Sequence, residues 1–311
     1  MFRIGLDVGG TKMVGVVTDG DGNIRQCLRK ETPPERSAER LMEAMASLVG
    51  ELRDLIEGAA VDSLGVGIAG YVDQERGFVH FGPNLGIERL PLGEKFREMT
   101  GLPVFVENDV NCALLGECAY GAAKGVSDAV GIFVGTGVGS AFKSGGRMVR
   151  GSRGVAAEAG HTIFIPGGRP CACGKRGCFE AYAGGRAIEM IIREAVRSNP
   201  STLLSREPAP TLSTVRRCML AGDSSARKIW DEVVVALRVL VTNVIVLFDP
   251  KVVVLGGKLI ESIPELFGDI QDFALNQGMR GLFYSVLVTT AALGDRAAAL
   301  GATLLREELN G

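Results

Sequence analysis

The segment Asp7-Val8-Gly9-Gly10-Thr11-Lys12 decides the fold through what stands on either side of it. An apolar stretch, residues 2–8, leads into the glycines, and a β-branched stretch, residues 13–18, follows them. The glycines therefore join strand to strand, whereas a Walker A loop or a dinucleotide-binding fingerprint joins a strand to a helix. In such a hairpin the backbone N–H groups and the Thr11 hydroxyl can face phosphates, and Asp7 can hold magnesium directly or through water. An ordinary glycine hairpin is an equally good interpretation of this segment alone.

A second glycine-rich turn stands roughly 125 residues further along, which is the kind of repeat that marks a duplicated architecture. Residues 129–134 have a strand pattern, Gly135-Thr136-Gly137-Val138-Gly139-Ser140 follows, and residues 141–143 are again strand-like. Either turn alone is weak evidence. Together they predict a duplicated fold in which two α/β lobes clamp one nucleotide.

The expected lobes divide the chain near residue 117. The first spans residues 1–117 and 295–311, and the second spans residues 118–294. In the second lobe a buried strand over residues 252–255 ends in Gly256-Gly257. Paired glycines at a strand end allow a ligand to approach the backbone, so we expect this pair to accept the adenosine moiety.

Polar side chains follow an expected strand over residues 103–106, at the kind of strand end where open α/β sheets collect ligands. The residues there are Glu107-Asn108-Asp109, followed by a helix, an arrangement that suits a carboxylate taking a hydroxyl proton. The alternative is that Asp109 only caps the helix. Asp295 is expected to cap a terminal helix over residues 297–308.

Gly70 and Asn84 are two further candidates for ligand contact. Gly70 follows a buried strand of residues 63–69, and the absence of a side chain permits close approach. Asn84 follows a hairpin of residues 71–81 and offers a donor and an acceptor to a hydroxyl-rich ligand. An Asn in a loop more often caps a turn.

A metal-ligand pattern lies in residues 158–180, where one imidazole and three potential thiolates fall close together. The four side chains are those of His161, Cys171, Cys173 and Cys178. Four protein ligands complete a tetrahedral zinc site and leave no position for a reacting water, so the site is expected to be structural. The alternatives are four unrelated residues or disulfides, but Cys171 and Cys173 are too close in sequence to pair comfortably.

Two glutamates flank this pattern. Glu158 stands three residues before His161, and Glu180 two residues after Cys178. A metal-pinned loop would hold both in fixed directions, as recognition of a polar substrate requires. Taken as an isolated pair, the two are better interpreted as solvated surface charges.

Bulk properties exclude several classes of protein. The formal net charge of -2 over 311 residues gives no sign of a basic surface for nucleic acid or anionic membrane. No charge-free run reaches the roughly 18 apolar residues of a membrane span. The N-terminus runs directly into a strand pattern and does not resemble a signal peptide, so we expect a cytoplasmic protein. The scattered cysteines fit reduced thiols; they are Cys27, Cys112, Cys118 and Cys218.

With these motifs in order, the whole chain resembles the ROK family of sugar kinases and repressors, within the actin-like ATPase/hexokinase superfamily. The resemblance implies a two-lobed, duplicated actin-like ATPase (ribonuclease H-like) α/β fold with a structural zinc loop. The motifs that carry it are Asp7–Lys12, Gly67–Gly70, Asn84–Leu85, Glu107–Asp109, Gly135–Gly139, Glu158–His161 and the very specific Cys171–Glu180. Ala157 and Ala69 depart from it, because many sugar kinases carry Gly and many glucokinases carry Pro at these positions.

The resemblance implies an ATP-dependent kinase for the primary (6-) hydroxyl of a hexose, with Mg²⁺ and a structural Zn²⁺. Asp109 would be the general base. Sugar contacts would come from Gly70, Asn84, Asn108, Asp109, Glu158, His161 and Glu180. Nucleotide contacts would come from Asp7, Gly9, Gly10, Thr11, Lys12, Gly135, Thr136, Gly137, Gly256 and Gly257.

Glucokinase is the leading expectation for the activity. Kinases for N-acetylglucosamine, N-acetylmannosamine or fructose are the enzymatic alternatives, because the sequence does not resolve the pocket around carbon 2. A sugar-sensing repressor of the same family would carry an additional DNA-binding domain of roughly 70 residues or more. The first hairpin begins at residue 2, which leaves no room for that domain. The resemblance also suggests a homodimer or homotetramer.

Overall fold

The computed structural model describes residues 1–276 and 285–310. The chain forms two compact units. The first consists of Met1–Ser127, Ala141–Ala157 and Ala292–Gly311, and the second of Asp128–Ser140 and Glu158–Ala291. The lobe boundaries expected from the sequence stay a prediction.

The first unit is built on a five-stranded sheet of order β3-β2-β1-β4-β8. The bounds are β1 Phe2–Val8, β2 Lys12–Thr18, β3 Ile24–Glu31, β4 Val61–Ile68 and β8 Val104–Asn108. β1, β2 and β3 pair antiparallel, whereas β1, β4 and β8 run parallel. The parallel strands therefore end at one edge of the sheet, where Asp7 and the β8–α3 turn lie.

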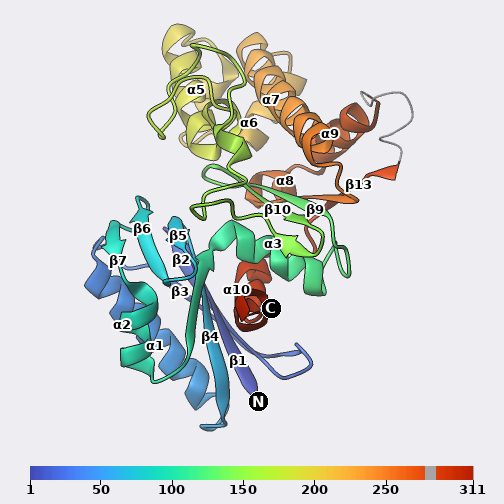
Figure 1. Ribbon diagram of the computed structural model, residues 1–311. Coiled ribbons are helices and arrows are strands. Elements are labelled where there is room, and N and C mark those ends of the chain that lie inside the picture. The colour runs from blue at the N-terminus through green and yellow to red at the C-terminus, as the bar shows by residue number, and fades with distance from the viewer. Residues whose placement is uncertain (277–284, 311) are drawn as a thin grey trace. The chain divides into compact units, whose positions relative to one another are not determined.

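Helices cover both faces of this sheet (Figure 1). They are α1 Ala38–Asp54 and α2 Leu92–Thr100 on one face, and α3 Asp109–Tyr120 and α10 Ala297–Ala302 on the other. Alternation along β2 explains the two contacts, because Val14 and Val16 pack against Ala299 and Leu300 of α10 while Met13 and Val17 join the core beneath α1. The Ser37 side chain caps α1 by accepting the N–H of Arg40.

Smaller elements complete the first unit. A three-stranded sheet of order β5-β6-β7 lies between β4 and α2 in the sequence. Its strands are β5 Tyr71–Asp73, β6 Phe78–Gly82 and β7 Ile87–Leu90, and the chain ends in α11 Leu305–Asn310. The expected terminal helix over residues 297–308 is therefore two helices.

The second sheet repeats the strand order of the first, β11-β10-β9-β12-β13. Its strands are β9 Ala129–Val134, β10 Val138–Ser144, β11 Arg147–Met148, β12 Val252–Gly256 and β13 Leu287–Thr290. β9, β12 and β13 run parallel, as β1, β4 and β8 do. A glycine turn joins the central strand to its neighbour in both sheets, as a duplicated fold requires.

The second unit also holds the helices that carry most of its apolar core. They are α4 Glu180–Ala183, α5 Gly185–Ser198, α6 Leu212–Leu220, α7 Ser224–Phe248, α8 Lys258–Ser262 and α9 Pro264–Asn276. Short 3₁₀ helices stand at Ala159–His161, Leu203–Arg206 and, in the first unit, Gly294–Arg296. In Figure 1, α5, α6 and α7 lie together as one helical group.

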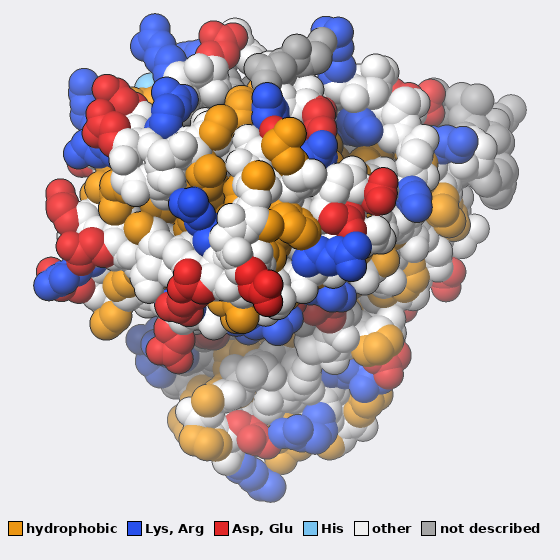
Figure 2. All heavy atoms as spheres, turned by 90° about the horizontal axis from the view of Figure 1, so that it is seen from below, with side chains coloured by type: hydrophobic (Ala, Val, Ile, Leu, Met, Phe, Trp, Pro, Cys, Tyr) orange, Lys and Arg blue, Asp and Glu red, His pale blue; other side chains and the backbone are white. Residues whose placement is uncertain are grey.

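Two surface properties agree with the composition. Over the described ranges, no helix is both long enough and apolar enough to cross a membrane. On the face drawn in Figure 2, Lys and Arg side chains are interspersed with Asp and Glu, so this face carries no basic stripe.

Candidate functional site

The β1–β2 turn is held by its own hydrogen bonds and by Thr32. The N–H of Gly9 donates to the carbonyl of Lys12 at 3.1 Å, which closes the hairpin. The Thr32 hydroxyl donates to the carbonyl of Gly9 at 2.6 Å, and the N–H of Thr32 donates to the carbonyl of Thr11 at 3.0 Å. The turn is therefore a fixed platform, as an anion-binding backbone must be.

Two carboxylic acids with raised pKa values belong to this part of the first unit. Burial, aided by repulsion from the Asp109 carboxylate, raises the pKa of Asp7 to about 8, against the opposing effect of Lys12. Burial raises the pKa of Asp109 to about 6, although a hydrogen bond from the N–H of Val110 acts in the opposite direction. Carboxyl groups with pKa values near neutrality can exchange protons at physiological pH, and such groups cluster at functional sites.

Asp295 lies beside the same turn. Its carboxylate accepts hydrogen bonds from Lys12 Nζ at 2.9 Å and from Arg29 Nε and Nη2, also at 2.9 Å. These contacts hold the pKa of Asp295 well below its usual range. The expectation that Asp295 caps the terminal helix is wrong, because α10 has Arg296 at its N-cap and no side-chain cap. No local pattern predicts this contact, because Lys12 and Asp295 are 283 residues apart.

The β8–α3 turn presents Asp109 at the first position of α3. Asn108, and not Asp109, is the N-cap, since its Oδ1 accepts the N–H groups of Val110 at 2.8 Å and Asn111 at 3.1 Å. The capping alternative for Asp109 is therefore wrong. Asn108 Nδ2 donates to the carbonyl of Gly70 at 3.2 Å, so two expected sugar-contact residues hydrogen bond to each other.

The glycines of the first unit have different surroundings. A Cβ on Gly70 would lie 2.5 Å from the Phe81 carbonyl oxygen, so strand packing alone explains this glycine. A Cβ on Gly10 would lie 3.0 Å from the Cβ of Asn84, which brings Asn84 next to the β1–β2 turn. A Cβ on Gly9 would meet only the Lys12 carbonyl, at 3.4 Å, within its own hairpin.

The β9–β10 turn of the second unit forms hydrogen bonds with helices that follow it in the sequence. The N–H of Gly185, at the start of α5, donates to the Gly135 carbonyl at 2.9 Å, and the N–H of Arg186 donates to the Thr136 carbonyl at 3.0 Å. Glu180 Oε2 accepts the N–H of Val138 at 3.0 Å. The turn thus has its carbonyls occupied by helix α5.

Glu180 explains one glycine of the β9–β10 turn. A Cβ on Gly137 would lie 2.2 Å from Glu180 Oε2, so a side chain at this position would displace that carboxylate. A Cβ on Gly135 would have no neighbour within 4 Å, which leaves its backbone open on that side. At the end of β12, Gly256 packs on Phe133, and Gly257 has a φ of +90° and packs on Val134.

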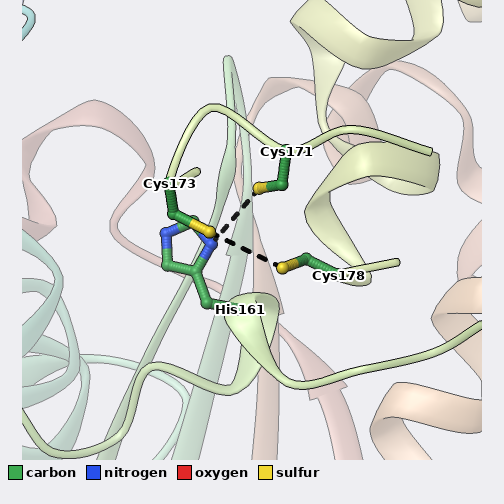
Figure 3. A group of neighbouring side chains, drawn as sticks. All are labelled: His161, Cys171, Cys173 and Cys178. Carbon is green, nitrogen blue, oxygen red and sulfur yellow. Dashed lines mark hydrogen bonds between the residues drawn. The ribbon is translucent and has the colours of Figure 1, made fainter. Parts of the chain in front are cut away.

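His161, Cys171, Cys173 and Cys178 gather in the second unit, and each offers one ligand atom within 4.8 Å of the other three (Figure 3). Cys171 Sγ lies 3.6 Å from His161 Nδ1, and Cys173 Sγ lies 3.6 Å from Cys178 Sγ. A tetrahedral zinc, with bonds of about 2.3 Å to sulfur and about 2.0 Å to nitrogen, separates its ligand atoms by about 3.5–3.8 Å. The cluster therefore has the donor set of a tetrahedral zinc site, and these two separations match that geometry.

The polypeptide around this cluster is fixed from several sides. His161 ends the 3₁₀ helix, and its carbonyl accepts Lys175 Nζ at 3.0 Å. Glu180 Oε1 lies 3.7 Å from Cys171 Sγ and 3.9 Å from His161 Nδ1. Arg169, within the loop, pairs with Glu194 of α5 at 2.8 Å. Glu180 consequently stands beside the ligand cluster and the β9–β10 turn at once.

Glu158 directly precedes the 3₁₀ helix and is half-buried. The next residue, Ala159, donates its N–H to Ser140 Oγ at 2.9 Å. Ala157, the departure noted in the sequence, has a φ of +67°, a left-handed conformation that favours glycine. The chain therefore enters this segment through a strained residue.

Comparisons with known proteins show what this chain is similar to. The family model described as the ROK family matches residues 3–308. A glucokinase of Thermotoga maritima is 33% identical over 315 residues, which cover 99% of this chain and 98% of that protein. The crystal structure of a ROK family glucokinase from Streptomyces griseus in complex with glucose and AMPPNP matches with a TM-score of 0.81 and 32% identity, covering 99% of this chain and 100% of that one. An N-acetylmannosamine kinase of Escherichia coli is 30% identical over 263 residues, 83% of this chain and 84% of that protein.

Proposed function

Because this chain belongs to the ROK family, we propose that it is an ATP-dependent hexokinase that phosphorylates the 6-hydroxyl of glucose. The observation that carries the proposal is the Asp109 carboxyl group at the start of α3, with a pKa of about 6, in the same unit as the β1–β2 turn. The similarity to glucokinases over nearly the whole chain supports glucose as the sugar.

Asp109 is the general base of the proposed reaction. Its carboxylate takes the proton of the sugar hydroxyl as that oxygen attacks the γ-phosphorus of ATP. A base works best when its pKa lies near the working pH, and burial raises the pKa of Asp109 toward that range. The position of Asp109 at the N-terminus of α3 acts in the opposite direction, because it favours the ionised form.

The two glycine turns hold the nucleotide in this proposal. The phosphates lie against the β1–β2 turn, with Asp7 as the magnesium ligand, directly or through a water. Magnesium supplies positive charge that neutralises the phosphate oxygens. The contacts assigned to ATP are those of Gly9, Gly10, Thr11 and Lys12, of Gly135, Thr136 and Gly137, and, for adenosine, of Gly256 and Gly257.

Polar side chains orient the sugar. We assign Gly70, Asn84 and Asn108 to sugar contact from the first unit, and Glu158, His161 and Glu180 from the second. The amide of Asn108 carries a second N–H besides the one given to the Gly70 carbonyl, and that group is the one we assign to a hydroxyl. The Glu180 carboxylate already accepts the Val138 N–H and retains further lone pairs.

The cysteine and histidine cluster would hold zinc as a structural ion. Three sulfurs and one nitrogen fill a tetrahedral site, so the metal would support the loop and perform no hydrolysis. The fold belongs in this proposal to the actin-like ATPase class, since both sheets share one strand order with a glycine turn beside the central strand. We further propose that the protein assembles as a homodimer or homotetramer.

ADP release from the purified protein with MgATP and a panel of sugars tests the proposal. The panel is glucose, mannose, fructose, N-acetylglucosamine and N-acetylmannosamine. Turnover that is fastest with glucose is the expected result. Turnover confined to N-acetylmannosamine would instead favour the second candidate, which rests on the N-acetylmannosamine kinase similarity. Absence of turnover with every sugar of the panel would contradict the proposed activity and leave a sugar-sensing role.

A further inference from the structure

Glu107 is a buried carboxylate that the proposed reaction does not use. Its side chain is only 1% exposed at the end of β8. Oε1 accepts the backbone N–H of Asn108 at 2.9 Å, Asn111 Nδ2 at 3.1 Å and Gln74 Nε2 at 3.2 Å. One oxygen thus collects three donors, two of which belong to the β8–α3 turn.

The other oxygen of Glu107 has a different partner. Oε2 accepts Arg150 Nε at 2.6 Å, and Arg150 Nη2 donates to Glu308 Oε1 at 3.1 Å. A buried carboxylate is costly unless it is paired, and Arg150 supplies the pairing charge. Oε1 therefore accepts hydrogen bonds from the β8–α3 turn, whereas Oε2 pairs with the Arg150 guanidinium.

Two of the three bonds of Oε1 fix the chain on both sides of Asp109. Glu107 holds the N–H of Asn108, the residue before Asp109, and the side chain of Asn111, the second residue after it. Asn108 in turn caps α3 and reaches the Gly70 carbonyl. We propose that Glu107 is a positioning residue that aims Asp109 at the sugar hydroxyl, and that Arg150 keeps Glu107 in its buried position. This inference rests on the proposed function.

Arg150 also stabilises the turn that leads to Ala157. Its carbonyl accepts the N–H of Ala156 at 3.0 Å, which closes the turn that ends at the strained Ala157. Glu158, one of the residues assigned to the sugar, follows directly. The Glu107–Arg150 pair thus anchors both the turn that carries the base and the start of the segment that leads to Glu158.

The division between the two oxygens gives a test that separates positioning from stability. Glu107→Gln keeps an oxygen that can accept the same three donors and loses the charge that pairs with Arg150. Glu107→Met fills similar volume and removes every acceptor. Glu308→Gln is the matched control, because it weakens the other contact of Arg150 and leaves the turn untouched.

A catalytic base displaced by about 1 Å can lower the rate about 100-fold. We expect a fall in kcat of this size for Glu107→Met. The KM for MgATP should stay within about threefold of the wild-type value. The Tm of Glu107→Gln should be lower than that of the wild type, because the charge that pairs with Arg150 is lost. Its kcat should stay within about fivefold of the wild-type value, since the hydrogen bonds to the turn persist. Glu308→Gln should leave kcat unchanged. A Glu107→Met protein with wild-type kcat, or a kcat of Glu107→Gln as low as that of Glu107→Met, would overturn the proposal.

Two further measurements keep the test decisive. If Glu107→Met does not fold, Asn111→Leu removes one donor to Oε1 without changing any charge, and kcat should fall with an unchanged KM for MgATP. A wild-type kcat in Asn111→Leu would overturn the proposal in that case. Hydrogen exchange at the Val110 and Asn111 amides should be faster in Glu107→Met or Asn111→Leu. This readout needs no kinase activity, so it separates failure of the positioning from failure of the proposed function.

Discussion

The β1–β2 turn and the β9–β10 turn share one topology and differ in what surrounds them. The first is accompanied by acids and a cation, with Asp7 and Asp109 carrying raised pKa values and Lys12 paired with Asp295. The second is held by α5 and by Glu180, which also stands beside the cysteine and histidine cluster.

The difference suggests how a duplicated fold came to hold two roles. Both copies keep a glycine turn that can face phosphates. The first copy adds groups that can move a proton, and the second adds a loop fixed by a candidate metal site. We infer that the proposed proton transfer belongs to the first unit and that the metal loop of the second unit contributes to recognition of the sugar.

The largest expected effect comes from Asp109→Asn. A general base supplies about 10²–10⁴-fold in rate, so turnover should fall by at least about 100-fold while the fold persists. Steady-state ADP release and circular dichroism measure the two effects. Near-normal turnover would remove Asp109 from the role of base.

The pH profile sharpens the same assignment. Burial raises the pKa of Asp109 to about 6, and the ionised carboxylate is the active form. In the wild-type protein kcat/KM for the sugar should therefore fall as the pH drops through about 6. The residual activity of Asp109→Asn should lack this step, and an identical step in both proteins would assign it to another group.

The next largest effect is expected in the second unit, from Cys171→Ser. Loss of one of four ligands should reduce bound zinc, which elemental analysis measures, and should lower glucose affinity by at least about tenfold, in line with ligand-shell substitutions. Cys27→Ser, outside the cluster, is the matched control and should retain zinc and glucose affinity. A zinc-free Cys171→Ser protein with full activity would refute the link between the metal loop and the sugar.

Asp7→Asn should separate function from stability in the first unit. The variant should lose most magnesium-dependent turnover, because it removes the proposed metal ligand. Burial raises the pKa of Asp7 from 3.8 to about 8, so the folded state favours the protonated acid. The stability that this proton binding provides is present at low pH and is lost as the pH rises through about 8.

Thermal unfolding in chelator, at several pH values, measures that second effect. The wild-type protein should lose stability between pH 5 and pH 8 as Asp7 ionises, whereas Asn carries no titrating proton. The Tm of Asp7→Asn relative to that of the wild type should therefore rise over this range. Asp21→Asn, which removes an exposed carboxylate from the β2–β3 turn, is the control. A Tm difference that is constant or shrinks with rising pH would contradict a raised pKa for Asp7.

The smallest expected effect is that of Ala157→Gly. The left-handed conformation at Ala157 costs about 1–2 kcal/mol, which glycine would relieve. Glycine also destabilises the folded state by about 0.5–1 kcal/mol, because it increases the entropy of the unfolded chain. The net gain should raise Tm by about 1–3 °C. Ala156→Gly, at the neighbouring residue without positive φ, should lower Tm. A lower Tm in Ala157→Gly would show that the strain at this residue is compensated by its contacts.

Local patterns predicted much of the fold because they depend on neighbouring residues. The strand on each side of Gly9-Gly10 and the Ser37 cap follow from short-range periodicity and capping chemistry. The cluster of His161 and three cysteines was also predictable, because its ligands lie within a short loop.

Contacts between distant segments were not predictable from such patterns. The sequence assigned Asp295 to a helix cap, whereas its carboxylate pairs with Lys12 far along the chain. Asn108 stays a proposed sugar contact, and its amide also donates to the Gly70 carbonyl, 38 residues earlier in the chain. Gly70 was expected to permit ligand approach, and the nearby carbonyl of Phe81 gives a second reason for glycine there. In each case the deciding partner lies in another element.

The division of roles between the units is tested most directly by equilibrium dialysis of radiolabelled glucose against Asp109→Asn and Cys171→Ser. Asp109→Asn should bind glucose with nearly wild-type affinity, because Asn can still hydrogen bond the hydroxyl, although turnover is lost. Cys171→Ser should bind glucose weakly. Loss of glucose binding in Asp109→Asn together with normal binding in Cys171→Ser would contradict the account.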